Sequence, residues 1–142
     1  HQGDLPGALS HVEQAIALNP ALGYAHEQRG RLLFGLKRFA DAEAAFTTAL
    51  QYEPEKRTTL FYLGLTEVEL RRWPAAAERF GGVVRIDPNF APGYSFLARS
   101  LAETGRLAAA RQAQLDARRY GADAEELRLT EIRLRQLEAA GE

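Results

Sequence analysis

The sequence predicts an all-α protein built as a stack of antiparallel helix hairpins. Three observations predict this fold: a 34-residue repeat, paired apolar-periodic stretches of about 14 residues, and glycine and proline confined to spaced positions. Alanine is abundant and β-branched residues are scarce, a composition that favours helices over strands. The length of 142 residues is sufficient for one domain with a continuous core.

The repeat is visible as columns of similar residues that recur every 34 positions. The columns are Pro20, Pro54 and Pro88; Ala8, Ala42, Ala76 and Ala110; Leu5, Phe39, Trp73 and Leu107; Val12, Phe46 and Phe80; and Gly30, Gly64 and Ala98. Agreement of five columns in one register is too regular for coincidence. A single hairpin cannot cover its own apolar face, so such repeats are stable only when they stack on neighbours.

Each repeat carries two predicted helices, and their ends follow from proline and glycine. The predicted helices lie near 6–18, 23–36, 38–52, 57–71, 74–86, 92–104, 107–120 and 124–139. Pro6 and Pro74 fall in first turns, where the missing N–H costs nothing. Second helices stop before the repeating prolines, because the residue before proline avoids the α region. Gly3 and Gly105 are predicted to be left-handed residues just past helix ends.

The last predicted helix differs from the others, and we interpret it as a helix that caps the end of the repeat array. Asp123, with Glu126 three residues later, is typical of a capping box at a helix start. The helix carries only a few large apolar residues among many charges. A repeat array needs such a polar-faced element at its end.

These columns resemble the tetratricopeptide repeat family over residues 1 to about 121. The matching residues are Gly30, Ala42, Phe46, Ala49 and Pro54 in one repeat and Leu63, Gly64, Ala76, Phe80 and Pro88 in the next. The resemblance implies a right-handed superhelical solenoid forming a single domain over 1–142. Its parts would be the second half of a repeat (1–22), two repeats (23–56 and 57–90), a degenerate repeat (91–122) and a capping helix (123–142). The chain begins at the turn within a repeat, which predicts a piece of a longer array.

Charge and composition exclude several classes of function. The net charge of −1, from 18 basic and 19 acidic residues, lacks the basic excess typical of nucleic-acid binding. No apolar run approaches the roughly 20 residues that a membrane span needs. The absence of cysteine fits a cytoplasm and a periplasm equally, so the compartment stays open. Arginine and alanine usage without methionine is typical of a GC-rich bacterial gene.

No residue pattern predicts catalysis, a cofactor or a metal site. The histidines are His1, His11 and His26, and they form no zinc-binding pair with each other or with cysteine. His26 lies in a packing column and is predicted to fill space. Gly81-Gly82 lies inside a predicted helix without the strand or lysine of a phosphate loop, and we expect it on the convex side.

The resemblance implies a concave groove lined by the first helix of each hairpin. Carried over to this sequence, the groove residues are Tyr24, Glu27, Gln28, Arg31, Phe61, Tyr62, Leu65, Ser95, Phe96 and Arg99. Aromatic side chains flanked by arginine are typical of binding hot spots. An equally good interpretation of Phe61 and Leu65 is packing between adjacent first helices. A family subgroup clamps chaperone C-terminal carboxylates with lysine and asparagine, and the corresponding positions here hold neither.

The sequence therefore predicts a protein–protein interaction scaffold without catalysis, binding an acidic-hydrophobic peptide in the groove. Two alternatives remain open. The chain could be the substrate-recruiting module of a larger enzyme, such as a glycosyltransferase or sulfotransferase. It could instead be a structural array that self-assembles into a homo-oligomer through its N-terminal end.

Overall fold

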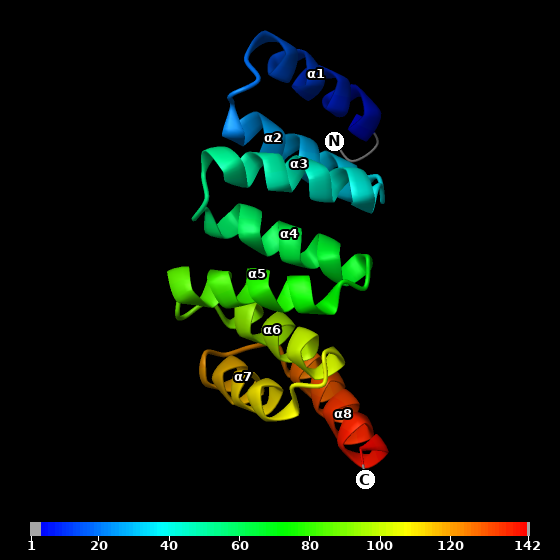
Figure 1. Ribbon diagram of the computed structural model, residues 1–142, viewed down its shortest axis with the longest axis vertical. Helices are drawn as coiled ribbons and strands as arrows, with labels where there is room; N and C mark the ends of the chain where they lie inside the picture. The colour runs from blue at the N-terminus through cyan, green and yellow to red at the C-terminus, as the bar shows by residue number, and fades with distance from the viewer. Residues whose placement is uncertain (1–3, 142) are drawn as a thin grey trace. The chain divides into compact units, whose positions relative to one another are not determined.

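The computed structural model describes residues 4–141, and its regular elements in that range are eight helices, with no strand (Figure 1). The helices are α1 (Leu5–Leu18), α2 (Gly23–Gly35), α3 (Phe39–Tyr52), α4 (Arg57–Glu69), α5 (Trp73–Ile86), α6 (Ala91–Glu103), α7 (Leu107–Arg119) and α8 (Ala124–Ala140). Every predicted helix is present. The largest error in a boundary is two residues, at the end of α4, which was expected at 71 and lies at Glu69. The all-α prediction is confirmed.

The chain folds as two compact units, the first ending at Leu70 and the second beginning at Arg71. In the first unit, α2 packs against α1 and α3, and α3 packs against α4. In the second unit, α6 packs against α5 and α7, while α8 packs against both α6 and α7. Sequential helices therefore lie side by side within each unit, as short connections favour.

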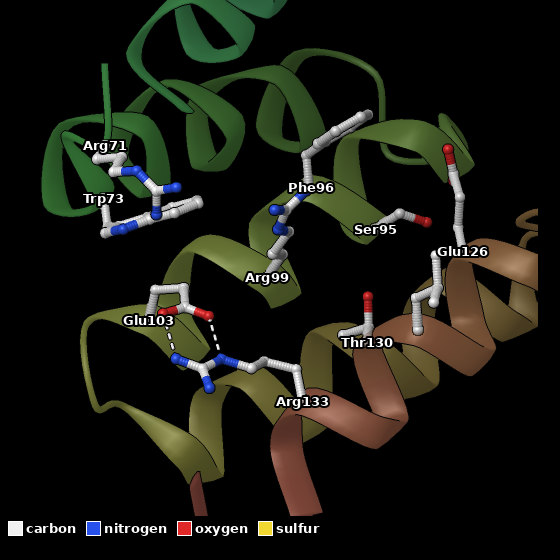
Figure 2. A pocket seen from close by; sticks show the side chains of 10 residues that line it. Arg71, Trp73, Ser95, Phe96, Arg99, Glu103, Glu126, Thr130 and Arg133 are labelled. Carbon is white, nitrogen blue, oxygen red and sulfur yellow. Dashed lines mark hydrogen bonds and ion pairs between the residues drawn. The ribbon is translucent and has the colours of Figure 1, made fainter. Parts of the chain in front are cut away.

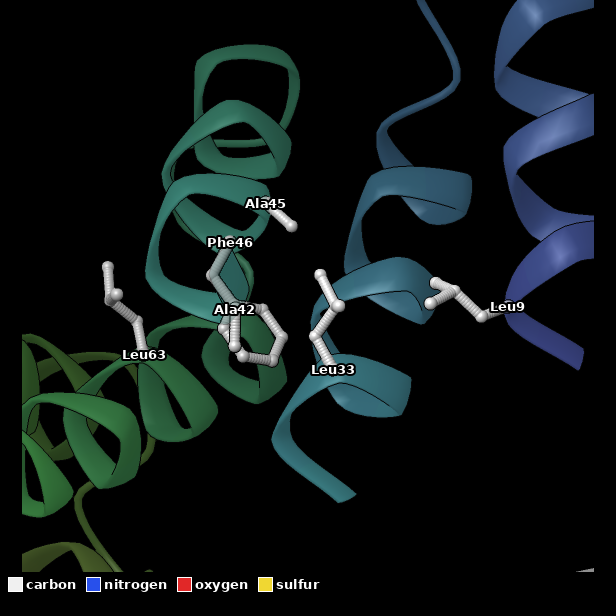
Figure 3. Close-up of a cluster of buried hydrophobic side chains, with 6 residues drawn as sticks. All are labelled: Leu9, Leu33, Ala42, Ala45, Phe46 and Leu63. Atoms are coloured by element: carbon white, nitrogen blue, oxygen red, sulfur yellow. The ribbon is translucent and has the colours of Figure 1, made fainter. Parts of the chain in front are cut away.

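The core of the first unit is formed where α2 and α3 meet their neighbours (Figure 3). Its buried residues are Leu9, Leu33, Ala42, Ala45, Phe46 and Leu63. A Cβ atom at Gly30 would lie 2.6 Å from a ring carbon of Phe46, closer than side chains can approach. Gly30 is therefore required because the Phe46 ring of the second helix packs against the backbone of the first helix.

The core of the second unit is built largely from alanine and is completed by the last helix. Its buried residues are Ala98, Leu101, Ala102, Ala110, Ala113 and Leu134. Alanine lets α6 and α7 approach closely, while Leu134 of α8 is fully buried and fills the remaining space. Here too a glycine permits close packing, since a Cβ at Gly93 would lie 2.9 Å from a methyl of Val84.

The turns inside the hairpins share one left-handed residue. Gly105 has φ +85°, which confirms its predicted conformation. The column that contains Gly3 and Gly105 also contains Lys37 and Arg71. Lys37 adopts a φ of 61° and Arg71 a φ of 56°, although neither is glycine. After Lys37, the N–H of Arg38 donates to the carbonyl of Leu33 at 2.9 Å and closes the helix end. The same prediction for Gly3 lies outside the described residues.

The junctions between hairpins are closed by a contact that recurs in both units. His26 Nε2 lies 2.7 Å from the Pro20 carbonyl, and the Tyr94 hydroxyl donates to the Pro88 carbonyl at 2.8 Å. Both rings also stack on a tyrosine 26 residues further along, His26 on Tyr52 at 5.9 Å and Tyr94 on Tyr120 at 5.3 Å between centroids. The packing role predicted for His26 is confirmed.

The last helix is capped and fastened as a solvent-facing element. The Asp123 carboxylate accepts from the backbone N–H groups of Glu125 and Glu126 at 3.0 and 3.1 Å, as expected for a helix N-cap. Arg111 of α7 binds two carboxylates of α8, with Nη1 2.7 Å from Glu131 and Nη2 2.6 Å from Glu138. These hydrogen bonds raise the pKa of Arg111 and lower the pKa of both carboxyls.

The glycine pair inside α5 is not uniform, and the expectation of two outward-facing glycines is corrected. A Cβ at Gly81 would have no atom within 4 Å, so this position is open. Gly82 is buried. Adjacent helical residues point about 100° apart, so one can face solvent while the next faces the core.

Candidate functional site

The predicted site residues lie on three first helices, distributed over both units. In the first unit, α2 carries Tyr24, Glu27, Gln28 and Arg31, and α4 carries Phe61, Tyr62 and Leu65. In the second unit, α6 carries Ser95, Phe96 and Arg99. Tyr24 is the most exposed aromatic of the set at 62%. Gln28, Phe61 and Leu65 are half-buried.

Glu27 is buried and its carboxylate is bound within the first unit. Only 3% of the residue is exposed. Lys56 Nζ lies 2.6 Å from Glu27 Oε2, and the Thr59 hydroxyl donates to the same oxygen at 3.0 Å. The hydrogen bond to Glu27 raises the pKa of Lys56, although burial opposes this. Glu27 thus joins α2 to the start of α4, and its charge is already compensated.

Arg31 and Tyr62 form a single contact surface between α2 and α4. The Arg31 guanidinium lies 4.8 Å above the centre of the Tyr62 ring, within the range of a cation–π interaction. The Tyr62 ring also stacks on Phe46 at 5.9 Å, so it is anchored to the buried core. The exposed guanidinium is therefore held in place over an aromatic support and keeps its N–H donors available.

The second unit contains a cavity of about 550 Å³ between α6 and α8 (Figure 2). It is lined by Arg71, Trp73, Ser95, Phe96, Arg99, Glu103, Glu126, Leu129, Thr130 and Arg133. All three site residues predicted on α6 are among them. Most of the others come from α8, while Trp73 is the first residue of α5 and Arg71 lies in the turn before it. We call this space the α6–α8 pocket.

The α6–α8 pocket carries more positive than negative side chains. Glu103 is bound by Arg133 in a two-pronged ion pair, with Nη2 and Oε2 3.0 Å apart. This hydrogen bond, together with the charges of Arg133, Arg99 and Arg71, lowers the pKa of Glu103. Arg99 lies 5.5 Å above the Trp73 ring. Among the described residues, neither Arg71 nor Arg99 forms an ion pair.

Ser95 presents an unusual polar group to the same pocket. The residue is only 6% exposed, and its hydroxyl oxygen has no hydrogen-bond partner in the described part of the chain. A buried hydroxyl without a partner is uncommon in folded proteins, because its desolvation is not compensated. Its side chain points from α6 toward α8 (Figure 2).

A model of the tetratricopeptide repeat family matches residues 1–51, 27–89 and 62–125, which together cover most of the chain. The chain belongs to the tetratricopeptide repeat family. No curated protein sequence matches it. Repeats of this family form protein-interaction scaffolds, and that general role applies to this chain.

Solved tetratricopeptide repeat proteins have the same fold at low sequence identity. A MamA double mutant, from RS-1, is 16% identical with a TM-score of 0.81, over 99% of this chain and 88% of that one. YrrB, described as having an unusual peptide-binding site, is 20% identical with a TM-score of 0.79, over 84% of this chain and 61% of YrrB. A TPR2B domain of yeast Sti1, in complex with an Hsp70 peptide, is 20% identical with a TM-score of 0.73, over 80% and 96%. These likenesses establish the fold.

The tetratricopeptide repeat register explains the pocket residues that sequence reasoning missed. The last helix lies 34 residues after α6, so Leu129, Thr130 and Arg133 occupy the positions of Ser95, Phe96 and Arg99. The predicted groove ended at α6 because α8 was interpreted only as a cap. Continuing the same columns by one more repeat would have found this wall of the pocket.

Metal-binding groups and membrane-spanning helices are both absent from residues 4–141. No group of three or more histidine, cysteine, aspartate or glutamate side chains in this range is arranged to hold a metal ion. No helix in the same range combines the length and hydropathy required to cross a bilayer.

Proposed function

We propose that this chain is an adaptor module that binds an acidic-hydrophobic peptide segment, and that the α6–α8 pocket is its main contact site. The observation that carries the proposal is the pocket itself. Three residues predicted from the repeat register, Ser95, Phe96 and Arg99, line one cavity of about 550 Å³. This volume is within the range typical of ligand sites and is large enough for one or two amino-acid side chains.

The chemistry of the pocket favours a ligand with both an apolar and an acidic part. Phe96 and Trp73 supply aromatic surface that removes apolar ligand atoms from water. Arg71 and Arg99 carry guanidinium groups that form no ion pair with a carboxylate of the described residues. A ligand carboxylate can form a two-pronged hydrogen bond with either guanidinium. In the first unit, Arg31 above Tyr62 repeats this pairing of arginine with an aromatic ring.

The peptide-binding tetratricopeptide repeat structures support the proposal by analogy. YrrB and the Sti1 domain are described with a peptide-binding site or a bound peptide. A domain of Spaghetti bound to an HSP90 peptide, 14% identical with a TM-score of 0.71, adds a third example. The groove positions used for chaperone tails hold no lysine or asparagine here, so we expect a different ligand.

The test uses random peptides about twelve residues long, displayed on phage and selected against the full chain. Selected peptides are synthesised, and their affinities are measured by fluorescence anisotropy. We expect Phe96→Ala to weaken binding by about 1–3 kcal/mol, the usual range for a hot spot. Charge reversal in Arg99→Glu should weaken it at least as much, because attraction becomes repulsion.

The matched control is Arg106→Glu, which makes the same charge change at an exposed position of the same unit outside the pocket. It should bind as wild type does. If Phe96→Ala and Arg99→Glu also retain full affinity while their helical content is normal, the ligand binds elsewhere and the proposed site is wrong.

A further inference from the structure

The α6–α8 pocket has two ends of different chemical character (Figure 2). At one end lie Arg71, Trp73 and Arg99, where the exposed groups are cationic. At the other end Ser95 faces Glu126 and Thr130 of α8, where the side-chain oxygens are two hydroxyls and a carboxylate. The ion pair of Glu103 with Arg133 lies at the base between α6 and α8.

The oxygen-rich end holds one buried hydroxyl without a partner and one exposed carboxylate. The Ser95 hydroxyl is buried and has no partner, and the Glu126 carboxylate forms no ion pair with any described residue. A hydroxyl and a carboxylate that face one space both accept hydrogen bonds from a cationic donor. The group that would satisfy them together is an ammonium or guanidinium, which carries several donors.

We propose that the α6–α8 pocket selects a peptide carrying a basic side chain close to its acidic one. The lysine or arginine of the ligand donates to Ser95 Oγ and the Glu126 carboxylate, while the acidic residue binds Arg71 and Arg99. This inference rests on the proposed function. It adds a positive charge to the expected peptide and fixes the direction in which the peptide lies in the pocket. It also makes α8 part of the recognition surface, because Glu126 and Thr130 belong to that helix.

Opposite charges at the two ends would fix the direction in which the peptide lies. A peptide bound in reverse would place its carboxylate beside Glu126 and its cation beside Arg99, and both juxtapositions are repulsive. Discrimination of this kind depends on unfavourable contacts in the wrong complex as much as on favourable ones in the right complex.

The experiment uses the peptides selected on the full chain, each also synthesised with its basic residue replaced by norleucine. We expect selected sequences to contain a basic residue within a few positions of an acidic one. Replacing it should weaken binding to wild type about tenfold, as for a charge-assisted hydrogen bond. The same replacement should have little effect on binding to Glu126→Gln, because the partner charge is gone.

Two matched variants separate this contact from general effects. Glu125→Gln removes the same charge from the same first turn of α8, but Glu125 is paired with Arg128 outside the pocket, so binding should not change. Ser95→Ala removes the unpartnered hydroxyl and should weaken binding about threefold to tenfold, while the melting temperature of the free chain stays the same or rises. Ser100→Ala is its control, since that hydroxyl is bonded to the Phe96 carbonyl at 2.8 Å; it should leave the affinity unchanged.

The results distinguish this inference from the proposed function. Suppose that Phe96→Ala weakens binding, but that the norleucine replacement weakens binding equally in wild type and in Glu126→Gln. The peptide site is then supported and the basic subsite is wrong. If selected peptides carry no basic residue, the subsite is again wrong. If no peptide is selected, or none is sensitive to Phe96→Ala, both proposals fail together.

Discussion

Gly30 and Gly81 both lie inside helices, but their surroundings give them different roles. The Phe46 ring occupies the space that a Cβ at Gly30 would need, while the space around Gly81 is open. Glycine inside a helix costs up to about 1 kcal/mol relative to alanine, so it persists where packing requires it. At Gly81 the structure shows no such requirement.

The pair predicts opposite effects of the same substitution. We expect Gly81→Ala to increase the free energy of unfolding by up to about 1 kcal/mol, because alanine loses less entropy on folding. Gly30→Ala should decrease it by about 1–3 kcal/mol, because the added methyl forces the Phe46 ring to move. Thermal or urea unfolding of the two variants measures both effects. A loss of stability in Gly81→Ala would show that this glycine is required after all.

Glu103 gives a second prediction for a single residue, concerning pH. Its pKa is lowered from an ordinary 4.5 by the hydrogen bond from Arg133, which means that folding favours its charged form. The resulting stability is fully present above pH 4.5 and is lost as the pH falls through the lowered pKa. Wild type should therefore lose more stability than Glu103→Gln between pH 6 and pH 3. Parallel melting curves of the two proteins over this range would contradict the role of the ion pair.

Among the elements, two of the turns inside hairpins carry a conformational strain that glycine would remove. Lys37 and Arg71 adopt a left-handed conformation that costs a side-chain-bearing residue about 1 kcal/mol, whereas Gly105 adopts it freely. We expect Lys37→Gly to increase stability by up to about 1 kcal/mol, and Gly105→Lys to decrease it by a similar amount. Urea unfolding measures both, and the same sign for both changes would show that turn conformation does not decide the effect.

The helices could be predicted from the sequence because each boundary has a local cause. Pro6, Pro74 and Asp123 mark helix starts, and the repeating prolines mark helix ends. The left-handed turns at Lys37 and Arg71 could not be predicted as such, since these residue types do not favour positive φ. Arg71 lies one repeat length before Gly105 and Lys37 lies two, and this shared column was the available signal.

The candidate site was predicted less completely than the helices. Groove positions indicate which way a side chain points, but not whether a neighbour covers it. Glu27 points to the predicted face and is nevertheless buried by Lys56 and Thr59, a contact between residues 32 positions apart. Trp73, the first residue of a second helix, and Arg71, in the turn before it, also line the α6–α8 pocket, and the groove pattern includes neither.

At the scale of the whole molecule, α8 differs from the first helices that share its register. Ile132 stands in the column of Gly30, Gly64 and Ala98. A second helix cannot pack closely against this face, because the small residue is replaced by a large one. The opposite face supplies the buried Leu134 and Thr130. The exposed side of the helix carries arginine and glutamate side chains together with the partly exposed Leu129 and Ile132.

Removal of α8 should expose the apolar surface of α6 and α7. A chain ending at Ala122 loses Leu134 and the two carboxylates that bind Arg111. We expect a lower melting temperature and concentration-dependent association, because a contiguous apolar patch becomes accessible. Light scattering and melting curves measure both. Arg128→Ala in the full chain, which removes only an exposed ion pair, is the control and should behave as wild type.

Trp73 reports on whether the ligand occupies the α6–α8 pocket. Trp73 is the only tryptophan in the sequence and lines this pocket. Titration of a selected peptide should change its fluorescence emission and saturate at the same Kd that anisotropy gives, since the peptide displaces water from the indole. Full binding by anisotropy with unchanged Trp73 emission, and unchanged affinity in Trp73→Phe, would place the ligand outside the pocket.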